Sequence, residues 1–489
     1  MQKIKSIKFN FIMNVLLTIS SVIFPLITFP YISRILLPEG TGIVSFATSI
    51  VAYFCMFAQL GIPTYGVRIC AQVRDDKDEL SKVVQELFII NLITTVVSYS
   101  IFYICIDFIP KMQCERKLFC IIGVSMFLNF IGVEWLYKGL EQYTYITIRS
   151  VLFKFIALLM MFVLIHCEKD YVIYGGITIF ASSASNILNF FNSRKYINFK
   201  VYKHYNLKRH IKPILTFFAM SFAITIYTNL DTVMLGFFKS NTEVGMYNAA
   251  IKIKGVLLGI VTSLGTVLLP RASYYIEHGL YNKFIEISKK AISFVFLVSI
   301  PLWVYFTIFA KEGILFLSGR EYMAAIWPMK VIMPTLLFVG LTNLMGIQML
   351  VPIGKEIYVL YSEIAGAVVN LIINYLLIPK YASIGASIGT TIAEITVWIV
   401  QIWALKDIVQ KAYKEVPYKK IIGATLGAIV CSVIVKKIIY NLNVFIILLI
   451  SSAVFLGIYV FILIVLKEQL TLEIRAILLN LILKRKRAK

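Results

Sequence analysis

Two lysines lie deep inside long apolar segments of this sequence, where a charged side chain is costly. Lys154 and Lys252 each follow roughly eight to ten residues of such a segment. A charge at the centre of a bilayer costs about 2.5–3.5 kcal/mol on insertion scales, so each cation needs a reason to be there. Lys252 cannot easily reach either membrane surface, and we expect it to line a watery cavity. Lys254 follows it about 200° around the helix and would face another direction.

Three arginines mark the ends of apolar segments: Arg34, Arg68 and Arg271. Two interpretations stay open for them. They could contribute to the same polar path through the membrane, or they could be interfacial anchors whose side chains extend to the lipid headgroups.

Acidic residues at membrane depth are the candidates for binding a coupling ion, a proton or sodium. These are Glu134, Asp231, Glu363 and Glu394, and they are accompanied by asparagines at positions 14, 229, 370 and 374. A structural role is the alternative for each. Glu134 and Lys138 are spaced to pair on one helix face, and the asparagines could join neighbouring helices.

No catalytic or metal-binding set accompanies these charges. The sequence contains no P-loop and no Gly-x-Ser-x-Gly motif. Its seven cysteines are scattered and its four histidines form no cluster, so neither a disulfide framework nor a metal site is predicted. We therefore expect no enzyme, no catalytic residue and no cofactor.

Composition places the chain in the membrane. Of 489 residues, 59% are hydrophobic and 15% are charged, with a mean hydropathy of +0.84, whereas soluble domains have about 25% charged residues. The formal net charge is +23. Because the basic residues lie in short clusters between apolar runs, they predict contact with membrane lipids and not with nucleic acid.

The apolar runs predict an all-α polytopic protein with about fourteen transmembrane helices, since each needs roughly 20 residues. The predicted spans are 11–33, 41–66, 87–110, 117–137, 146–166, 171–191, 213–238, 243–268, 291–316, 326–351, 357–379, 384–405, 420–440 and 443–466.

The distribution of Lys and Arg predicts the orientation of these spans. With the N-terminus inside, cytoplasmic segments hold 33 of the 48 basic residues and external loops hold eight. The positive-inside rule then places both termini in the cytoplasm. Every predicted external loop is short, so any function must lie between the helices.

A shift of about 203 residues superposes the second predicted span on the eighth. Thr41-Gly42-Ile43 then falls on Val244-Gly245-Met246. We interpret this as a parallel repeat of two six-helix lobes, the architecture of a transporter. The predicted divisions are 1–205, 206–415 and 416–489, the last containing two additional helices and a basic tail.

Several motifs resemble those of bacterial polysaccharide repeat-unit flippases of the O-antigen, capsule and teichoic type. The segment Glu134-Trp135-Leu136-Tyr137, followed by Arg149 and Lys154, is the most specific. The segments at 29–36, 40–42, 60–68, 231–236 and 244–252 add to it, and the resemblance covers nearly the whole chain. This family belongs to the multidrug/oligosaccharidyl-lipid/polysaccharide exporter superfamily. One departure is Leu37-Pro38-Glu39, where a glycine-rich turn is expected, and it leaves open whether Arg34 faces the lumen.

The resemblance implies that an undecaprenyl-diphosphate-linked oligosaccharide moves from the cytoplasmic to the outer leaflet of the bacterial inner membrane. Basic side chains would replace water around the diphosphate as it crosses. The residues implied are Arg34, Arg68, Arg149, Lys154, Lys252 and Arg271. A polysaccharide polymerase is a candidate partner.

Three alternatives stay open at this point. A drug or cation antiporter of the same superfamily would present acids to its substrate, a lipid II flippase would move a related lipid, and a membrane glycan polymerase would need a sizeable external loop. The sequence does not identify the glycan, the coupling ion or the oligomeric state.

Overall fold

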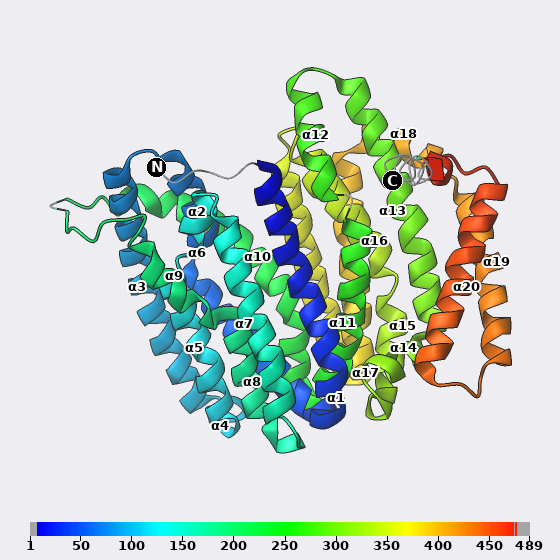
Figure 1. Cartoon of the computed structure of the whole chain (residues 1–489), viewed down its shortest axis with the longest axis horizontal. Helices are drawn as coiled ribbons and strands as arrows, with labels where there is room; N and C mark the ends of the chain where they lie inside the picture. Colours follow the sequence, from blue (N-terminus) through cyan, green and yellow to red (C-terminus); the bar gives the residue numbers. More distant parts are fainter. Residues whose placement is uncertain (1–6, 203, 264, 474, 477–489) are drawn as a thin grey trace, which may run out of the picture. The chain divides into compact units, whose positions relative to one another are not determined.

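The computed structural model describes residues 7–202, 204–263, 265–473 and 475–476, and within these ranges the regular secondary structure is all helical, without a β-strand (Figure 1). The chain divides into two compact units, residues 1–248 and 249–489. The predicted boundaries at 205 and 415 are not the boundaries of these units, and the three-part division stays a prediction.

The first unit contains eleven numbered α-helices, and the last of them continues into the second unit. They are α1 (Ile7–Gln59), α2 (Ile62–Gln72), α3 (Lys77–Phe108), α4 (Pro110–Cys114), α5 (Arg116–Gly132), α6 (Glu134–Gly139), α7 (Tyr143–Leu164), α8 (Tyr171–Ile179), α9 (Asn186–Ser193), α10 (Lys208–Phe238) and α11 (Asn241–Thr262). A 3-10 turn, η1 (Glu168–Asp170), precedes α8, and a π-helical turn, η2 (Phe180–Ala184), joins α8 to α9.

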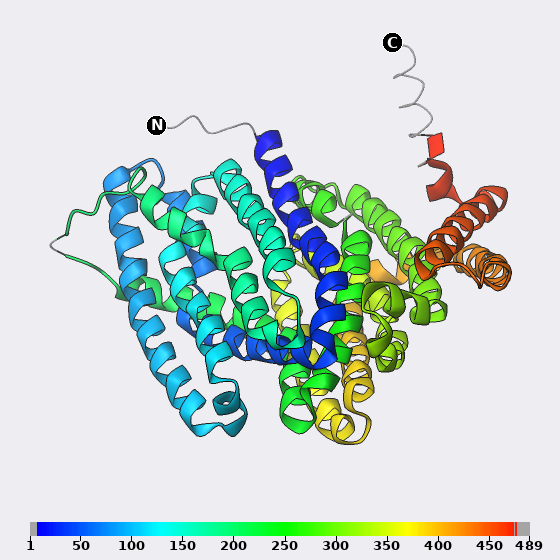
Figure 2. The ribbon, with the colours of Figure 1, turned by 60° about the horizontal axis from the view of Figure 1, so that its bottom comes forward.

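The second unit continues with α12 (Gly265–Glu277), α13 (Tyr281–Ile308), α14 (Ala310–Leu317), η3 (Arg320–Ala325), α15 (Ile326–Ile332), α16 (Thr335–Asn343), η4 (Leu344–Leu350), α17 (Glu356–Ala404), α18 (Lys406–Glu415), α19 (Tyr418–Ile438) and α20 (Val444–Val465). The last two helices form a hairpin and lie side by side in both ribbon views (Figures 1 and 2).

The longest helices each contain a break that separates two predicted spans. In α1 the break is at Leu37, whose φ is 57°; the residue before a proline is disfavoured in the α region, and Pro38 follows. In α17 the break is at Ala382, with φ 47°. The predicted span 117–137 is interrupted in the same way, because Val133 is left-handed at φ 34° between α5 and α6.

By length and apolar composition, the described chain has ten helices able to cross a membrane, or eleven if the pair Arg320–Ile332 and Thr335–Leu350, bent by 49°, is one span. This count is lower than fourteen because the two broken helices each cover two predicted spans and α5 has only 17 residues. Each predicted span falls mostly on helical residues. The chain is an all-helical polytopic membrane protein, and the number fourteen stays a prediction.

The packing of the first unit depends on two glycines where α1 meets the start of α11. A Cβ on Gly42 would lie 1.8 Å from the carbonyl oxygen of Asn241, and one on Gly245 would lie 2.0 Å from that of Pro38. Both positions therefore require glycine. The contact is reciprocal under the predicted repeat, since Pro38 and Asn241, like Gly42 and Gly245, are 203 positions apart.

Candidate functional site

A buried arginine organises the polar interior of the first unit. Arg149, one turn into α7, is 5% exposed. Its guanidinium lies 3.4 Å from the carboxylate of Glu134 and donates a hydrogen bond to the side-chain oxygen of Asn186 at 3.1 Å. Glu134 also pairs with Lys138 at 2.8 Å, as the sequence spacing predicts. The first turn of α6 and the second turn of α7 thus meet through opposite charges.

Lys154 lies farther along the same helix and has a different environment. Its ammonium donates to the hydroxyls of Ser20 at 3.0 Å and Ser21 at 2.7 Å, both on α1. Within the described chain no carboxylate comes within ion-pair distance of it, although the charge of Glu134 acts on it from farther away. Lys154 is therefore a half-buried cation that is solvated by hydroxyls and not neutralised by an adjacent acid.

A cavity of about 540 Å³ opens in the same unit between α1, α5, the π-helical turn and α10. We call it the neutral cavity. Nine of its seventeen lining residues carry a hydroxyl or an amide, and none is charged. These nine are Thr48, Gln59, Ser125, Asn129, Ser182, Ser183, Ser221, Thr225 and Asn229.

Two asparagines connect the neutral cavity to the buried arginine. Asn186 donates to the side-chain oxygen of Asn129 at 3.3 Å, and its own oxygen accepts from Arg149. Because a guanidinium only donates, the arginine fixes which end of the Asn186 amide faces it. This in turn orients Asn129, whose NH₂ group is then the donor in its contact with Cys55, and both residues line the cavity.

The other predicted basic residues have more exposed surroundings than Arg149. Arg34, Arg68 and Arg271 are exposed in the structure, and a guanidinium nitrogen of Arg34 donates to the carbonyl of Pro30 in its own helix. Their exposure fits both the interfacial-anchor interpretation and a role at the entrance of a path. Lys252 lies half-buried on α11. The predicted binding roles of all four stay predictions.

The four predicted coupling-ion residues lie in three different surroundings. Glu134 belongs to the Arg149 cluster with about a third of its side chain exposed. Asp231 is buried and accepts a hydrogen bond from the Tyr247 hydroxyl. Glu363 and Glu394 lie on opposite sides of the break in α17 and are close enough for their charges to interact. The structure contains no group of three or more metal-binding side chains among its described residues.

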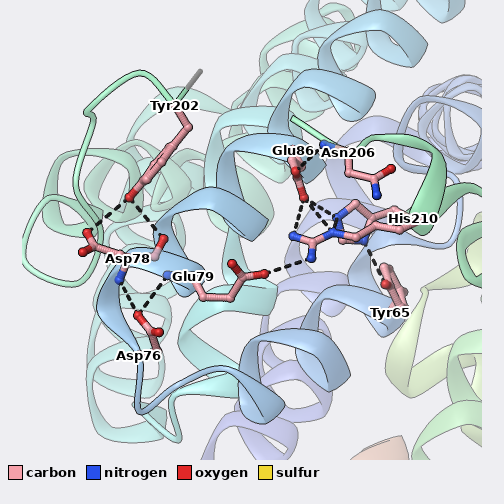
Figure 3. Close-up of polar contacts among 9 residues, drawn as sticks. Tyr65, Asp76, Asp78, Glu79, Glu86, Tyr202, Asn206 and His210 are labelled. Atoms are coloured by element: carbon pink, nitrogen blue, oxygen red, sulfur yellow. Dashed lines mark hydrogen bonds and ion pairs between the residues drawn. The ribbon is translucent and has the colours of Figure 1, made fainter. Parts of the chain in front are cut away.

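Sequence reasoning missed a second charged cluster, at the junction of α2, α3 and α10 (Figure 3). Glu86 and His210 are completely buried, with the imidazole nitrogen 2.8 Å from the carboxylate. Arg209 binds the same carboxylate oxygen at 2.6 Å and Glu79 at 2.9 Å. The Tyr65 hydroxyl lies 2.9 Å from the other nitrogen of His210.

The segment that precedes α10 forms hydrogen bonds with the same part of α3. The backbone N–H of Asn206 donates to Glu86 at 2.6 Å, and the Tyr202 hydroxyl donates to Asp78 (Figure 3). Desolvation and the Asp78 charge raise the pKa of Tyr202. A glutamate in an apolar helix was the available signal in the sequence, but the partners of Glu86 lie 120 or more positions away.

Comparison with known proteins agrees with this architecture. A family model described as "Polysaccharide biosynthesis protein" matches residues 7–276. A protein of Escherichia coli (strain K12) named "Putative O-antigen transporter" is 23% identical over 381 residues, which is 77% of this chain and 91% of that protein.

Two solved structures share the fold. A lipid II flippase, MurJ, in an inward closed conformation has a TM-score of 0.69 at 17% identity and covers 92% of this chain and 98% of its own. An inward-facing multidrug resistance MATE family transporter of the MOP superfamily has a TM-score of 0.63 at 13% identity, covering 81% and 96%. All three similar proteins are named as transporters or flippases and not as enzymes.

Proposed function

This chain belongs to the polysaccharide biosynthesis protein family, and from that premise we propose that it is a flippase for undecaprenyl-diphosphate-linked oligosaccharide repeat units. It moves them from the cytoplasmic to the outer leaflet by alternating access. The relative named as an O-antigen transporter supports a lipid-linked oligosaccharide as the substrate class. The multi-pass helical fold, shared with MurJ and MATE proteins, supports transport between helices.

The observation that carries this proposal is the environment of Lys154. A diphosphate that leaves water needs a cation in the interior that is not already neutralised by an adjacent carboxylate. Lys154 meets this requirement, since the nearest groups that it binds are the hydroxyls of Ser20 and Ser21. A phosphate oxygen can displace these hydroxyls, because it forms a stronger, charge-assisted hydrogen bond with the ammonium.

Alternating access requires helices that can bend, and the chain has breaks where bending can occur. α1 changes direction at Leu37, α17 at Ala382, and two segments are π-helical, Phe180–Ala184 and Leu344–Leu350. Such interruptions weaken the continuous hydrogen-bond ladder of a helix. We propose that they separate the parts that move from the parts that stay packed.

The remaining predictions complete the proposed mechanism. Fourteen spans form two six-helix lobes and two further helices, with both termini in the cytoplasm of the bacterial inner membrane. Arg34, Arg68, Arg149, Lys252 and Arg271 act with Lys154 on the headgroup. A proton or sodium ion couples through one of Glu134, Asp231, Glu363 and Glu394. A polysaccharide polymerase then receives the product.

The test is the leaflet distribution of lipid-linked oligosaccharide in cells that lack the gene. Intermediates that accumulate facing the cytoplasm, with loss of surface polysaccharide and rescue by the intact gene, are the expected result. Intermediates that face outward without polymerisation would instead favour a polymerase. Unchanged intermediates would overturn the proposal and favour a small-molecule antiporter, and accumulation of lipid II alone would favour a lipid II flippase.

A further inference from the structure

We propose that the neutral cavity of the first unit binds the sugar portion of the transported lipid and distinguishes glycosylated from bare carrier. The inference rests on the proposed function and goes beyond it, because it assigns sugar recognition to hydroxyl and amide side chains and not to the charged residues. It also names the residues that set the specificity.

The lining chemistry selects the class of ligand. Neutral hydroxyls and amides both donate and accept hydrogen bonds, as sugar hydroxyls do. A cationic drug would need a carboxylate in the wall, and a bare phosphate would need a lysine or an arginine. The cavity has none of these, while nine of its seventeen lining residues are neutral hydroxyl or amide residues. Its volume of about 540 Å³ lies within the usual range for ligand sites, about 300–1,000 Å³.

Ser125 and Asn129 join helices through Cys55 and Asn186, but the other polar side chains of the cavity do not serve mainly this purpose. Polar residues that hold membrane helices together form hydrogen bonds across to a neighbour. Here Thr48, Ser182 and Asn229 bond to carbonyls of their own helices at 2.7–3.3 Å. Such bonds leave hydroxyl lone pairs, or the remaining groups of an amide, for a ligand. Gln59 and Ser221 make no side-chain hydrogen bond within the described chain.

A local change of helix type brings two neighbouring serines to the same wall. Ser182 and Ser183 both line the cavity and lie in the π-helical turn Phe180–Ala184. In a regular α-helix, consecutive side chains point about 100° apart. The Ser182 and Ser183 hydroxyls instead lie 3.2 Å from each other. Single π-helical turns occur often at functional sites.

Arg149 contributes to this site as a positioning residue. Through Asn186 it fixes the orientation of the Asn129 amide, so that the Asn129 NH₂ group meets the thiol of Cys55, another residue of the cavity lining. Lysine in place of Arg149 cannot make the same pair of planar contacts with Glu134 and Asn186. The orientation of a side chain in the neutral cavity, that of Asn129, is thus set by Arg149, a charged residue outside the cavity lining.

The experiment measures binding of two probes to the purified full-length protein by native mass spectrometry. One probe is undecaprenyl diphosphate, and the other is the undecaprenyl-diphosphate-linked repeat unit extracted from the strain that encodes this chain. We expect the intact protein to bind the glycosylated probe more tightly. Ser182→Val with Ser183→Val should weaken the glycosylated probe roughly tenfold, since two hydrogen bonds are lost, and change the bare probe less than twofold.

Controls separate this inference from the proposed function. Gln59→Leu with Ser221→Ala tests cavity residues on α1 and α10, outside the π-helical turn, and Ser100→Val on an exposed part of α3 should change nothing. Equal weakening of both probes by the cavity variants, or none, would overturn the sugar site while leaving a flippase intact. Failure of the intact protein to bind either probe would overturn both.

Discussion

At the scale of single residues, the environment of a charge decides what it can do more than its depth in the membrane. Arg149 and Lys154 are five positions apart on one helix, yet Arg149 is neutralised by Glu134 whereas Lys154 is held by two serines. The first is suited to hold other side chains in place and the second to bind an anion.

Lys154→Gln should abolish export of the lipid-linked oligosaccharide while membrane abundance stays normal. The amide keeps hydrogen bonds to Ser20 and Ser21 but carries no charge for a diphosphate. Lys154→Arg should retain part of the activity, because the charge remains with a different geometry. Complementation of the deletion strain, scored by surface polysaccharide, measures both.

The matched control for this test is Lys419→Gln, which removes an exposed lysine near the start of α19 and should leave export unchanged. Full activity of Lys154→Gln would contradict the assignment of Lys154 to the diphosphate.

The sequence selected candidate basic residues in this unit but not the groups that they contact. Residue type and depth were enough to select Lys154, and the motif resemblance selected Arg149. The serines that hold Lys154 are 133 and 134 positions away. The neutral cavity was missed because serine, threonine and asparagine cost less free energy in membrane helices than charged residues do. Such residues therefore do not stand out in the sequence, and only the fold shows that they lie together.

At the scale of elements, the Glu86 cluster fastens the start of α10 to α3. The carboxylate of Glu86 receives Arg209, His210 and the backbone of Asn206, so α10 and the segment before it are held by one completely buried group. Residues of α10 also line the neutral cavity. A shift of the start of α10 would therefore change the shape of the cavity wall.

Glu86→Ala should lower the free energy of unfolding by about 3 kcal/mol, since it leaves the completely buried imidazole of His210 and the backbone N–H of Asn206 without their shared acceptor. Unfolding of the purified protein in a mild detergent measures the change.

Glu79→Ala is the comparison, because it also removes a partner of Arg209 but at a half-exposed site, with about a third of each side chain accessible. Its cost should stay below about 1 kcal/mol. Similar costs for the two variants would show that burial at Glu86 has no energetic role.

The positions where helices end or break were harder to predict from the sequence than the presence of the helices. Every predicted span lies mostly on helix, but left-handed residues such as Leu37, Val133 and Ala382 were not foreseen. Only the first has a sequence cause, the following proline. Valine and alanine disfavour a positive φ on their own, so at these two positions the surrounding packing sets the backbone.

At the scale of the whole molecule, the distribution of 48 basic residues along the chain predicts one orientation in the membrane. A green fluorescent protein fused to either terminus should fluoresce, and alkaline phosphatase fused to either terminus should be inactive. Active phosphatase at one terminus would contradict the prediction and change the parity of the span count.

The contact of Gly42 with Gly245 gives a test of the predicted repeat. Gly42→Val and Gly245→Val should each destabilise the protein, because each new side chain meets a backbone carbonyl at about 2 Å. Their effects should not add, since both open the same contact. Thermal unfolding of the two single variants and the double variant measures this coupling, and strict additivity would mean that the two sites are independent.

That reciprocity has a consequence for ancestry. A pairing in which Gly42 meets Asn241 while Gly245 meets Pro38 is what a two-fold axis produces between identical chains. If the halves descend from one gene, its product once formed a homodimer, and any mutation at the shared glycine entered the interface twice. Fusion ended that constraint for the rest of the sequence and left each copy free to diverge. On that descent, the two glycines are a place where the older symmetry still holds, because a side chain at either glycine would meet the backbone of the other half.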